Sequence, residues 1–302
     1  MPIITADNIT NLYEKARIRL GWISDVTWSP NNRSLAVANG ERISFHDADT
    51  LKIITSLTGH SGPVKSIAVN PNGTKLASAT ADTTARIWDL QAGGTFIELK
   101  LHADAVNAVA FSPDGKLLVT GGADHCLWIW NSATGEGQMR LRAHNDEVTS
   151  VAFLRKGRVL AAGSRDNSIW RWKDGGLGAT VDPIWKHDNW VRHITPSPDG
   201  QILASASRDG TVRVWDDVKG NERLKLFAHE GGADAAAFSP DGSLLVTSGR
   251  DNTIKFWQVA DGSHLHTITG HAKPVLTLAF SPDGTHLATG SGDNTVRLWT
   301  SI

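Results

Sequence analysis

Residues 270–299 read GHAKPVLTLAFSPDGTHLATGSGDNTVRLW, and the landmarks of this stretch recur along the chain. It holds a Gly-His pair, an aspartate 22 residues after the histidine, and a tryptophan six residues after the aspartate. Six such sets follow one another at intervals of 42 or 43 residues: His60, Asp82 and Trp88; His102, Asp124 and Trp130; His144, Asp166 and Trp172; His187, Asp209 and Trp215; His229, Asp251 and Trp257; His271, Asp293 and Trp299. A fixed period of this length indicates a repeat architecture.

The turns between these landmarks distinguish strands from helices. Ser-Pro-Asp-Gly occupies residues 112–115, 197–200, 239–242 and 281–284, and Asn-Pro-Asn-Gly occupies residues 70–73. Proline suits the second position of a type I turn and glycine its end. Alternating apolar stretches flank the turns, as at 106–111 and 117–120, which is typical of strands joined in a hairpin. A unit of about 42 residues then has room for four strands of about six residues.

A divergent copy of the repeat precedes the six clear ones. Aligning Ser29-Pro30 with the later Ser-Pro pairs places Arg19, Asn39 and Phe45 where the other copies have His, Asp and Trp. Seven units account for nearly all of the 302 residues, so we expect a single domain over residues 1–302.

The Gly-His pairs, the Trp-Asp pairs at 88–89 and 215–216, and the aspartate six residues before each tryptophan resemble the WD-repeat family over essentially the whole chain. The resemblance implies an all-β fold, a seven-bladed β-propeller with a four-stranded antiparallel sheet in each blade. It also implies that residues near 11–18 supply the outer strand of the last blade and so close the ring. Without that strand, the last blade would expose an edge.

Composition and charge narrow the function classes. With 40% hydrophobic and 20% charged residues, the chain has the balance of a soluble protein, and no run of 18 apolar residues predicts a membrane span. A net charge of −1 leaves no global field for nucleic acid or an anionic membrane. The single cysteine, Cys126, excludes an internal disulfide, and the amino terminus lacks a secretory signal. We therefore expect a cytoplasmic protein without membrane contact.

The recurring His, Asp and Trp could suggest hydrolase chemistry, but an active site needs one converging set rather than six copies around a ring. The family resemblance implies instead a structural hydrogen-bond network. In it Asp orients His, His meets a hydroxyl such as Ser207 or Ser291, and the hydroxyl accepts the indole N–H. Histidines on separate blades cannot share a metal ion. The Gly-rich stretches at 121–122 and 175–178 lack the helix and lysine of a phosphate loop, so no cofactor and no small-molecule substrate are expected.

Function is expected where the copies differ, because the shared residues build the scaffold. The family resemblance places three residues of each blade on the upper rim of the propeller. From blade one to blade seven these are: Trp22, Ser24 and Ala38; Pro63, Lys65 and Ala81; Ala105, Asn107 and Ala123; Glu147, Thr149 and Arg165; Trp190, Arg192 and Arg208; Gly232, Asp234 and Arg250; Pro274, Leu276 and Gly292.

The rim residues of blades four to six predict a binding site for a partner protein. Arg165, Arg192, Arg208 and Arg250 would clamp an acidic or phosphorylated segment, with Trp190 as the apolar anchor. Trp22 and Leu276 would add secondary apolar contacts. This hypothesis describes a non-catalytic interaction scaffold within a larger complex.

Three alternatives stay open at this point. The arginines could merely pair with Glu147 and Asp234, forming a solvated ring of charge. The crescent of arginine and tryptophan could instead bind nucleic acid. Trp128 and Trp170, which replace a basic residue two positions before the repeat tryptophan, could pack between blades or extend the rim as an aromatic ledge. Blade one lacks the polar network, so we expect it and the terminal closure to open first.

Overall fold

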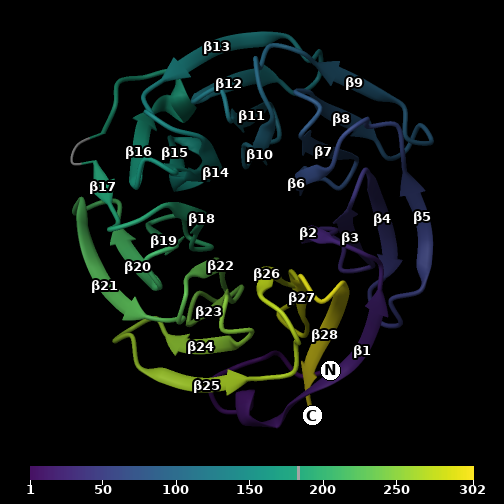
Figure 1. The fold of residues 1–302 in the computed structure, drawn as a ribbon, viewed down its shortest axis with the longest axis vertical. Helices are drawn as coiled ribbons and strands as arrows, with labels where there is room; N and C mark the ends of the chain where they lie inside the picture. Colours follow the sequence, from purple (N-terminus) through teal and green to yellow (C-terminus); the bar gives the residue numbers. More distant parts are fainter. Residues whose placement is uncertain (182–183) are drawn as a thin grey trace.

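The protein folds into seven four-stranded antiparallel sheets arranged around a central axis, as a computed structural model covering residues 1–181 and 184–302 describes it (Figure 1). In each sheet one strand lies nearest the axis and the others follow outward, so each sheet is one blade. The seven-bladed β-propeller and its antiparallel sheets are thus confirmed.

The first four blades follow one another in chain order. Blade one contains β2 (Ile23–Trp28), β3 (Ser34–Asn39), β4 (Arg42–Asp47) and β5 (Ile53–Leu57). Blade two contains β6 (Val64–Val69), β7 (Lys75–Thr80), β8 (Ala85–Asp89) and β9 (Phe96–Leu99). Blade three contains β10 (Val106–Phe111), β11 (Leu117–Gly122), β12 (Cys126–Asn131) and β13 (Gly137–Arg142). Blade four contains β14 (Val148–Leu154), β15 (Val159–Ser164), β16 (Ser168–Lys173) and the short β17 (Trp185–Lys186).

The last three blades complete the ring. Blade five contains β18 (Val191–Pro196), β19 (Ile202–Ser207), β20 (Thr211–Asp216) and β21 (Asn221–Phe227). Blade six contains β22 (Ala233–Phe238), β23 (Leu244–Gly249), β24 (Ile254–Gln258) and β25 (His264–Ile268). Blade seven contains β26 (Val275–Phe280), β27 (Leu287–Ser291), β28 (Thr295–Ser301) and, as its outer strand, β1 (Leu12–Arg19).

The ring closes by pairing the two ends of the chain. Strand β1 runs antiparallel to β28 along its whole length, from Leu12 opposite Ser301 to Arg19 opposite Thr295 (Figure 1). The Arg297 guanidinium adds an ion pair to Glu14 at 2.8 Å. The expected closure by an N-terminal strand is therefore confirmed, and the edge of β28 is covered.

The hydrophobic core is divided among the seven interfaces between blades. Leu76 of β7 packs toward blade one, whereas the next residue, Ala77, packs toward blade three. Because each blade is covered on both faces, strands such as β7 are buried almost continuously rather than at alternate residues. These interfaces hold each blade against its neighbours and thereby fix the positions of the loops at both ends of the channel.

Helical structure is limited to three short 3₁₀ turns in the described residues, at Ile9–Asn11, Arg155–Gly157 and Asp174–Gly176. No helix within residues 1–181 and 184–302 is long and apolar enough to cross a membrane.

Blade one departs from the sequence alignment. Leu35 pairs with His46, 11 residues later, whereas the equivalent Leu118 of blade three pairs with Trp130, 12 residues later. The β3–β4 turn is therefore one residue shorter, so His46 rather than Phe45 occupies the tryptophan position. Asn39 ends β3 and does not take the place of a turn aspartate. Ala38 is fully buried between blades one and two, so its assignment to the upper rim is wrong.

Candidate functional site

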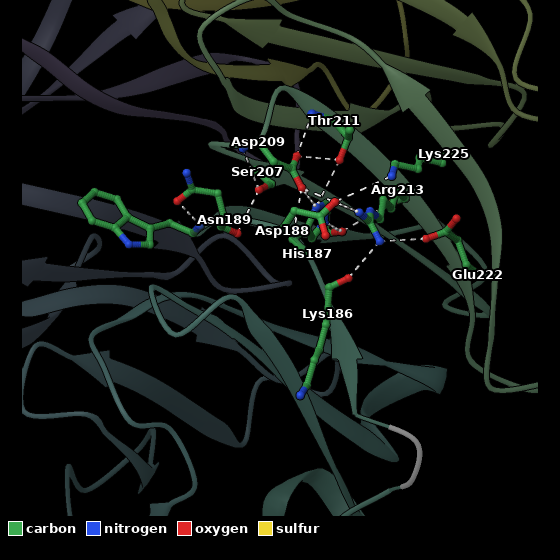
Figure 2. Close-up of polar contacts among 12 residues, drawn as sticks. Lys186, His187, Asp188, Asn189, Ser207, Asp209, Thr211, Arg213, Glu222 and Lys225 are labelled. Carbon is green, nitrogen blue, oxygen red and sulfur yellow. Dashed lines mark hydrogen bonds and ion pairs between the residues drawn. The ribbon is translucent and has the colours of Figure 1, made fainter.

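The recurring polar residues form buried networks, which blade five illustrates (Figure 2). His187 Nδ1 lies 3.0 Å from the Asp209 carboxylate, and His187 Nε2 lies 2.6 Å from the hydroxyl of Ser205. The Trp215 indole N–H donates to the same hydroxyl at 2.7 Å. The hydroxyl is therefore Ser205 and not Ser207, which instead donates to the carbonyl of Asn189.

The protonation states of this network follow from its geometry. Burial lowers the pKa of His187, against the attraction of Asp209, so the imidazole is neutral at neutral pH. Burial alone would raise the pKa of the Asp209 carboxyl, but hydrogen bonds from His187 and Thr211 hold that pKa well below its usual range. A neutral His187 then donates from Nδ1 and accepts at Nε2, which satisfies every member of the network.

The same arrangement recurs in four other blades, with the hydroxyl always ten residues before the tryptophan. The hydroxyl residues are Ser78, Thr120, Thr247 and Thr289. Thr289, not Ser291, is the partner of His271. In blade four the position is Ala162, and His144 Nε2 is buried without a hydrogen-bond partner among the described residues, although His144 Nδ1 keeps its contact with Asp166 at 3.0 Å.

A β-bulge shapes the upper rim of every blade. In each inner strand the pairing register shifts after the first residue, as between Val64 and Ser66 in β6. The residue inside each shift is the second of the three rim residues: Ser24, Lys65, Asn107, Thr149, Arg192, Asp234 and Leu276. Bulges release such a residue from the ladder and re-aim its side chain.

These residues surround the upper mouth of a central channel of about 1120 Å³. The lining includes Trp22, Arg165, Arg192, Arg250 and Leu276 of the expected site, whereas Trp190 and Arg208 lie outside it. In blades two to seven the two rim loops are tied together, because the third rim residue donates its N–H to the carbonyl of the first, as from Arg208 to Trp190 at 2.9 Å. The rim is thus a fixed platform around the mouth.

Two arginines hold one carboxylate and a third lies near them, and we call Arg192, Arg208, Arg250 and Asp234 the arginine cluster. Arg192 Nε lies 3.0 Å and Arg250 Nε lies 3.4 Å from the buried Asp234 carboxylate. Arg208 packs its Cδ close to Gly232 and has no ion pair among the described residues. Burial lowers the pKa of Arg250, and the Arg208 and Arg192 charges add to this effect against Asp234.

A second group lies on blades four and five. The Arg165 guanidinium pairs with Glu147 at 2.7 Å and sits 4.9 Å above the Trp190 ring. Glu147 also accepts a hydrogen bond from Asn107 at 3.3 Å, and Asn107 accepts one from Lys65 at 3.0 Å. A polar chain therefore runs along the mouth from blade two to blade five. The ion pairs expected of a solvated charge ring are present for Arg165, Arg192 and Arg250.

The two additional tryptophans pack against the blades. Trp128 and Trp170 are half-buried and lie 5.8 Å and 6.5 Å from the repeat tryptophans of their blades, measured between ring centroids. In blade five the same position holds Arg213, which reaches Asp188, Glu222 and the Lys186 carbonyl (Figure 2). Trp128 packs against a hydrophobic cluster shared by blades two and three, and Trp170 against one shared by blades three and four, which favours interblade packing over an aromatic ledge.

Sequence reasoning missed two features of the mouth. Lys273 lines it beside Pro274, although it is not one of the three expected rim residues of blade seven. Asp234, expected as a rim residue and as a partner in a solvated ring of charge, is instead a buried carboxylate on which two arginines depend. Within residues 1–181 and 184–302, no group of three His, Cys, Asp or Glu side chains could hold a metal ion.

Comparison with known proteins places these observations in a family. The family model described as "WD domain, G-beta repeat" matches residues 51–89, 94–131, 135–173, 181–216, 220–258 and 262–300. A small ribosomal subunit protein RACK1y of Oryza sativa is 34% identical over 82 residues, covering 26% of this chain and 24% of that protein. A guanine nucleotide-binding protein subunit beta of Schizosaccharomyces pombe is 35% identical over 66 residues, covering 22% of each.

Human striatin is 37% identical over 59 residues, covering 20% of this chain and 8% of striatin. This chain therefore spans less than a quarter of the length of each of these three relatives. The family model, in contrast, covers well over half of the chain in six consecutive repeats, each of which spans the outer strand of one blade and the three inner strands of the next. The chain belongs to the WD-repeat family.

Proposed function

We propose that this protein is a non-catalytic scaffold that binds an acidic or phosphorylated segment of a partner protein at the upper mouth of the propeller. Five cationic side chains line this mouth, against the two carboxylates of Glu147 and Asp234, and Arg208 stands beside them just outside the lining. The five are Lys65, Arg165, Arg192, Arg250 and Lys273. In a chain with a net charge of −1, this local excess of positive charge is the observation that carries the proposal.

The unpaired Arg208 adds specific support. Arg192 and Arg250 already hold Asp234, so their guanidinium groups are partly satisfied. Arg208 stands beside them with no carboxylate of its own among the described residues, and a bound carboxylate or phosphate would supply one. Guanidinium groups bind both anions through paired N–H donors.

The repeated histidines do not suggest catalysis, because each described His–Asp pair is part of a structural contact that ties one loop to its blade. One relative is named as a protein of the small ribosomal subunit, and another as a subunit of a guanine nucleotide-binding protein. By analogy, we infer that this scaffold works in the cytoplasm as a subunit of a larger complex.

Arg208→Glu is the sharpest test. It reverses the charge of the one cluster arginine that Asp234 does not require, so the free energy of unfolding should change by no more than about 1 kcal/mol. Arg33→Glu makes the same charge change at the exposed lower turn of blade one and serves as the control. Proteins captured from extracts of the native host by each variant would be identified by mass spectrometry.

We expect Arg208→Glu to lose partners that the wild type and Arg33→Glu retain. An unchanged set of partners would contradict the proposal. If the captured ligand were nucleic acid, its affinity would fall by orders of magnitude between about 50 and 200 mM salt, whereas a protein contact with an apolar anchor would change less.

A further inference from the structure

Trp22 is the most exposed aromatic side chain at the mouth, with 59% of its surface accessible. It stands between Gly21, whose φ of +98° allows the chain to turn out of β1, and Ile23, which is fully buried at the start of β2. The Leu20 N–H donates to the carbonyl of Asn294 at 3.0 Å and ties the connection between β1 and β2 to blade seven. The backbone on both sides of Trp22 is therefore fixed while its ring faces the mouth.

The ring of Trp22 lies against the rim of blade seven. A Cβ atom on Gly292 would stand 3.9 Å from Trp22 Cζ3, an ordinary van der Waals separation, so the Trp22 ring lies close to this part of the blade-seven rim. The Gly292 N–H donates to the Pro274 carbonyl at 2.9 Å, and Leu276 is half-buried at the bulge of the same blade. We call Trp22, Pro274, Leu276 and Gly292 the apolar arc.

Trp190, the aromatic residue first expected to anchor a ligand, is in a different state. Its ring is 40% exposed, and one face is covered by the Arg165 guanidinium, which Glu147 holds in place. No aromatic ring or cation of the described residues stacks on Trp22. Trp22 is thus the aromatic surface of this mouth that is free to take an apolar partner.

We infer that the apolar arc binds one large apolar side chain, Leu, Phe or Trp, of the same partner segment whose acidic group is held by the arginine cluster. This inference rests on the proposed function and names the second contact and the direction of the bound segment. The segment crosses the mouth from blades five and six, where Arg192 and Arg250 stand, to blades seven and one. Lys273, exposed at the edge of the apolar arc, favours further acidic residues beside the apolar one.

Charge complementarity argues for this occupant rather than a neutral hydrophobic surface. The apolar arc has lysine side chains on both flanks, Lys273 on blade seven and Lys65 on blade two, and the arginine cluster lies on the adjacent blades. A purely apolar partner would bury these charges without a counter-charge, which costs free energy. An acidic segment with a single apolar anchor satisfies both parts of the mouth.

The test begins with the full-length protein and a phage-displayed library of random 12-residue peptides. The selected peptides would be synthesised with a fluorescent label, and their dissociation constants measured by anisotropy with wild type, Arg208→Glu, Trp22→Ala, Trp22→Phe and Trp190→Ala. Each peptide would also be made with its large apolar residue replaced by Ala. Thermal unfolding of each variant verifies that it is folded.

We expect peptides that combine acidic residues with one large apolar residue. Replacing that residue should weaken binding to the wild type by about tenfold to a hundredfold, the range for burying one such side chain. With the Trp22→Ala protein, replacing the apolar residue of the peptide should change affinity less than threefold, because the partner of that residue is gone. With Trp22→Phe and with Trp190→Ala, the peptide replacement should weaken binding about as much as it does with the wild type.

Two results would overturn the inference while the proposed function stands. Acidic peptides that need Arg208 but show no dependence on an apolar residue would do so, as would an apolar dependence that Trp22→Ala leaves intact. Recovery of no peptide that depends on Arg208 would overturn the proposed function and the inference together.

Discussion

Blade four lacks one hydroxyl that five other blades possess, and replacing Ala162 by Ser should supply it. In those five blades the hydroxyl oxygen lies 2.6–2.9 Å from the histidine Nε2 and accepts the tryptophan indole N–H at 2.7–3.0 Å. Ala162 occupies the same position relative to Trp172, and His144 Nε2 has no partner among the described residues. Ala162→Ser should therefore complete the network.

The expected gain in the free energy of unfolding follows from the cost of leaving His144 Nε2 buried without a hydrogen bond. An unsatisfied buried polar atom costs about 1–3 kcal/mol, and part of a new hydrogen bond is offset by desolvating the added hydroxyl. A net gain of about 1 kcal/mol is expected, or roughly 2 °C in Tm for a protein of this size. Serine is preferred to threonine because Ala162 is fully buried and an extra methyl group would overpack the site.

The assay is urea unfolding of wild type and two single variants. Ala161→Ser is the control, because Ala161 is equally buried but faces blade five, away from His144, and should be neutral or destabilising. The gain from Ala162→Ser should vanish when His144 is replaced by Ala. A loss of stability in Ala162→Ser, or an equal gain from Ala161→Ser, would refute the reasoning that His144 lacks a needed partner.

Three further predictions concern stability and opening. Burial raises the pKa of Asp25 to about 6 in the folded protein, above its unfolded value of 3.8, so the wild type should gain up to about 3 kcal/mol relative to Asp25→Asn as pH falls from 7 to 4. Urea midpoints of both proteins would be measured across this pH range, and a stability difference between them that does not change with pH would contradict the prediction. Thr120→Val should cost about 2–4 kcal/mol in urea unfolding, because it deprives both His102 and Trp130 of their partner, and a loss below about 0.5 kcal/mol would argue against this role. Backbone amides of blade one and of the β1–β28 closure should exchange hydrogen fastest, since blade one lacks the network, and the strongest protection there would disprove this.

The regular part of the fold was predictable because it repeats. The period, the Ser-Pro-Asp-Gly turns and the alternating stretches each specify strands and hairpins, and the seven blades are the four-stranded antiparallel sheets that these signals predict. The residues of blade one were misaligned because a turn shorter by one residue shifts the pairing of β3 and β4. Blade one also has no tryptophan that would mark the position. His46, which takes that position, instead contacts Ser44 at 2.8 Å and the Leu51 carbonyl at 2.9 Å.

The hydroxyl partner was misassigned for a related reason. Ser205 and Ser207 lie on the same face of β19, so alternation along the strand does not distinguish them. Only the pairing register does, because Leu203 lies opposite Trp215 and brings Ser205 beneath the indole. A sequence signal did exist, since a Ser or Thr stands ten residues before the tryptophan in five copies and Ala162 replaces it in the sixth.

At the rim, the types of residue could be predicted from the sequence, but their contacts with one another could not. The sequence assigns the same clamping role to four rim arginines, yet three hold carboxylates and Arg208 does not. Two tryptophans likewise differ only in space, because Arg165 covers Trp190 and leaves Trp22 open. The bulges that aim the second rim residue are equally hidden, because an extra residue in a strand becomes visible only through its partner strand.

The arginine cluster holds three like charges close together on blades five and six. Arg250 is held beside two like charges with a single carboxylate to share, and its lowered pKa reflects that repulsion together with its burial. A second acidic residue at the rim would relieve this repulsion, yet the rim positions of the neighbouring blade seven are Pro274, Leu276 and Gly292. Under the proposed function, an anionic ligand bound beside Arg208 would offset the repulsion among these three charges. The place where we propose binding is therefore also the place where the fold holds like charges close together.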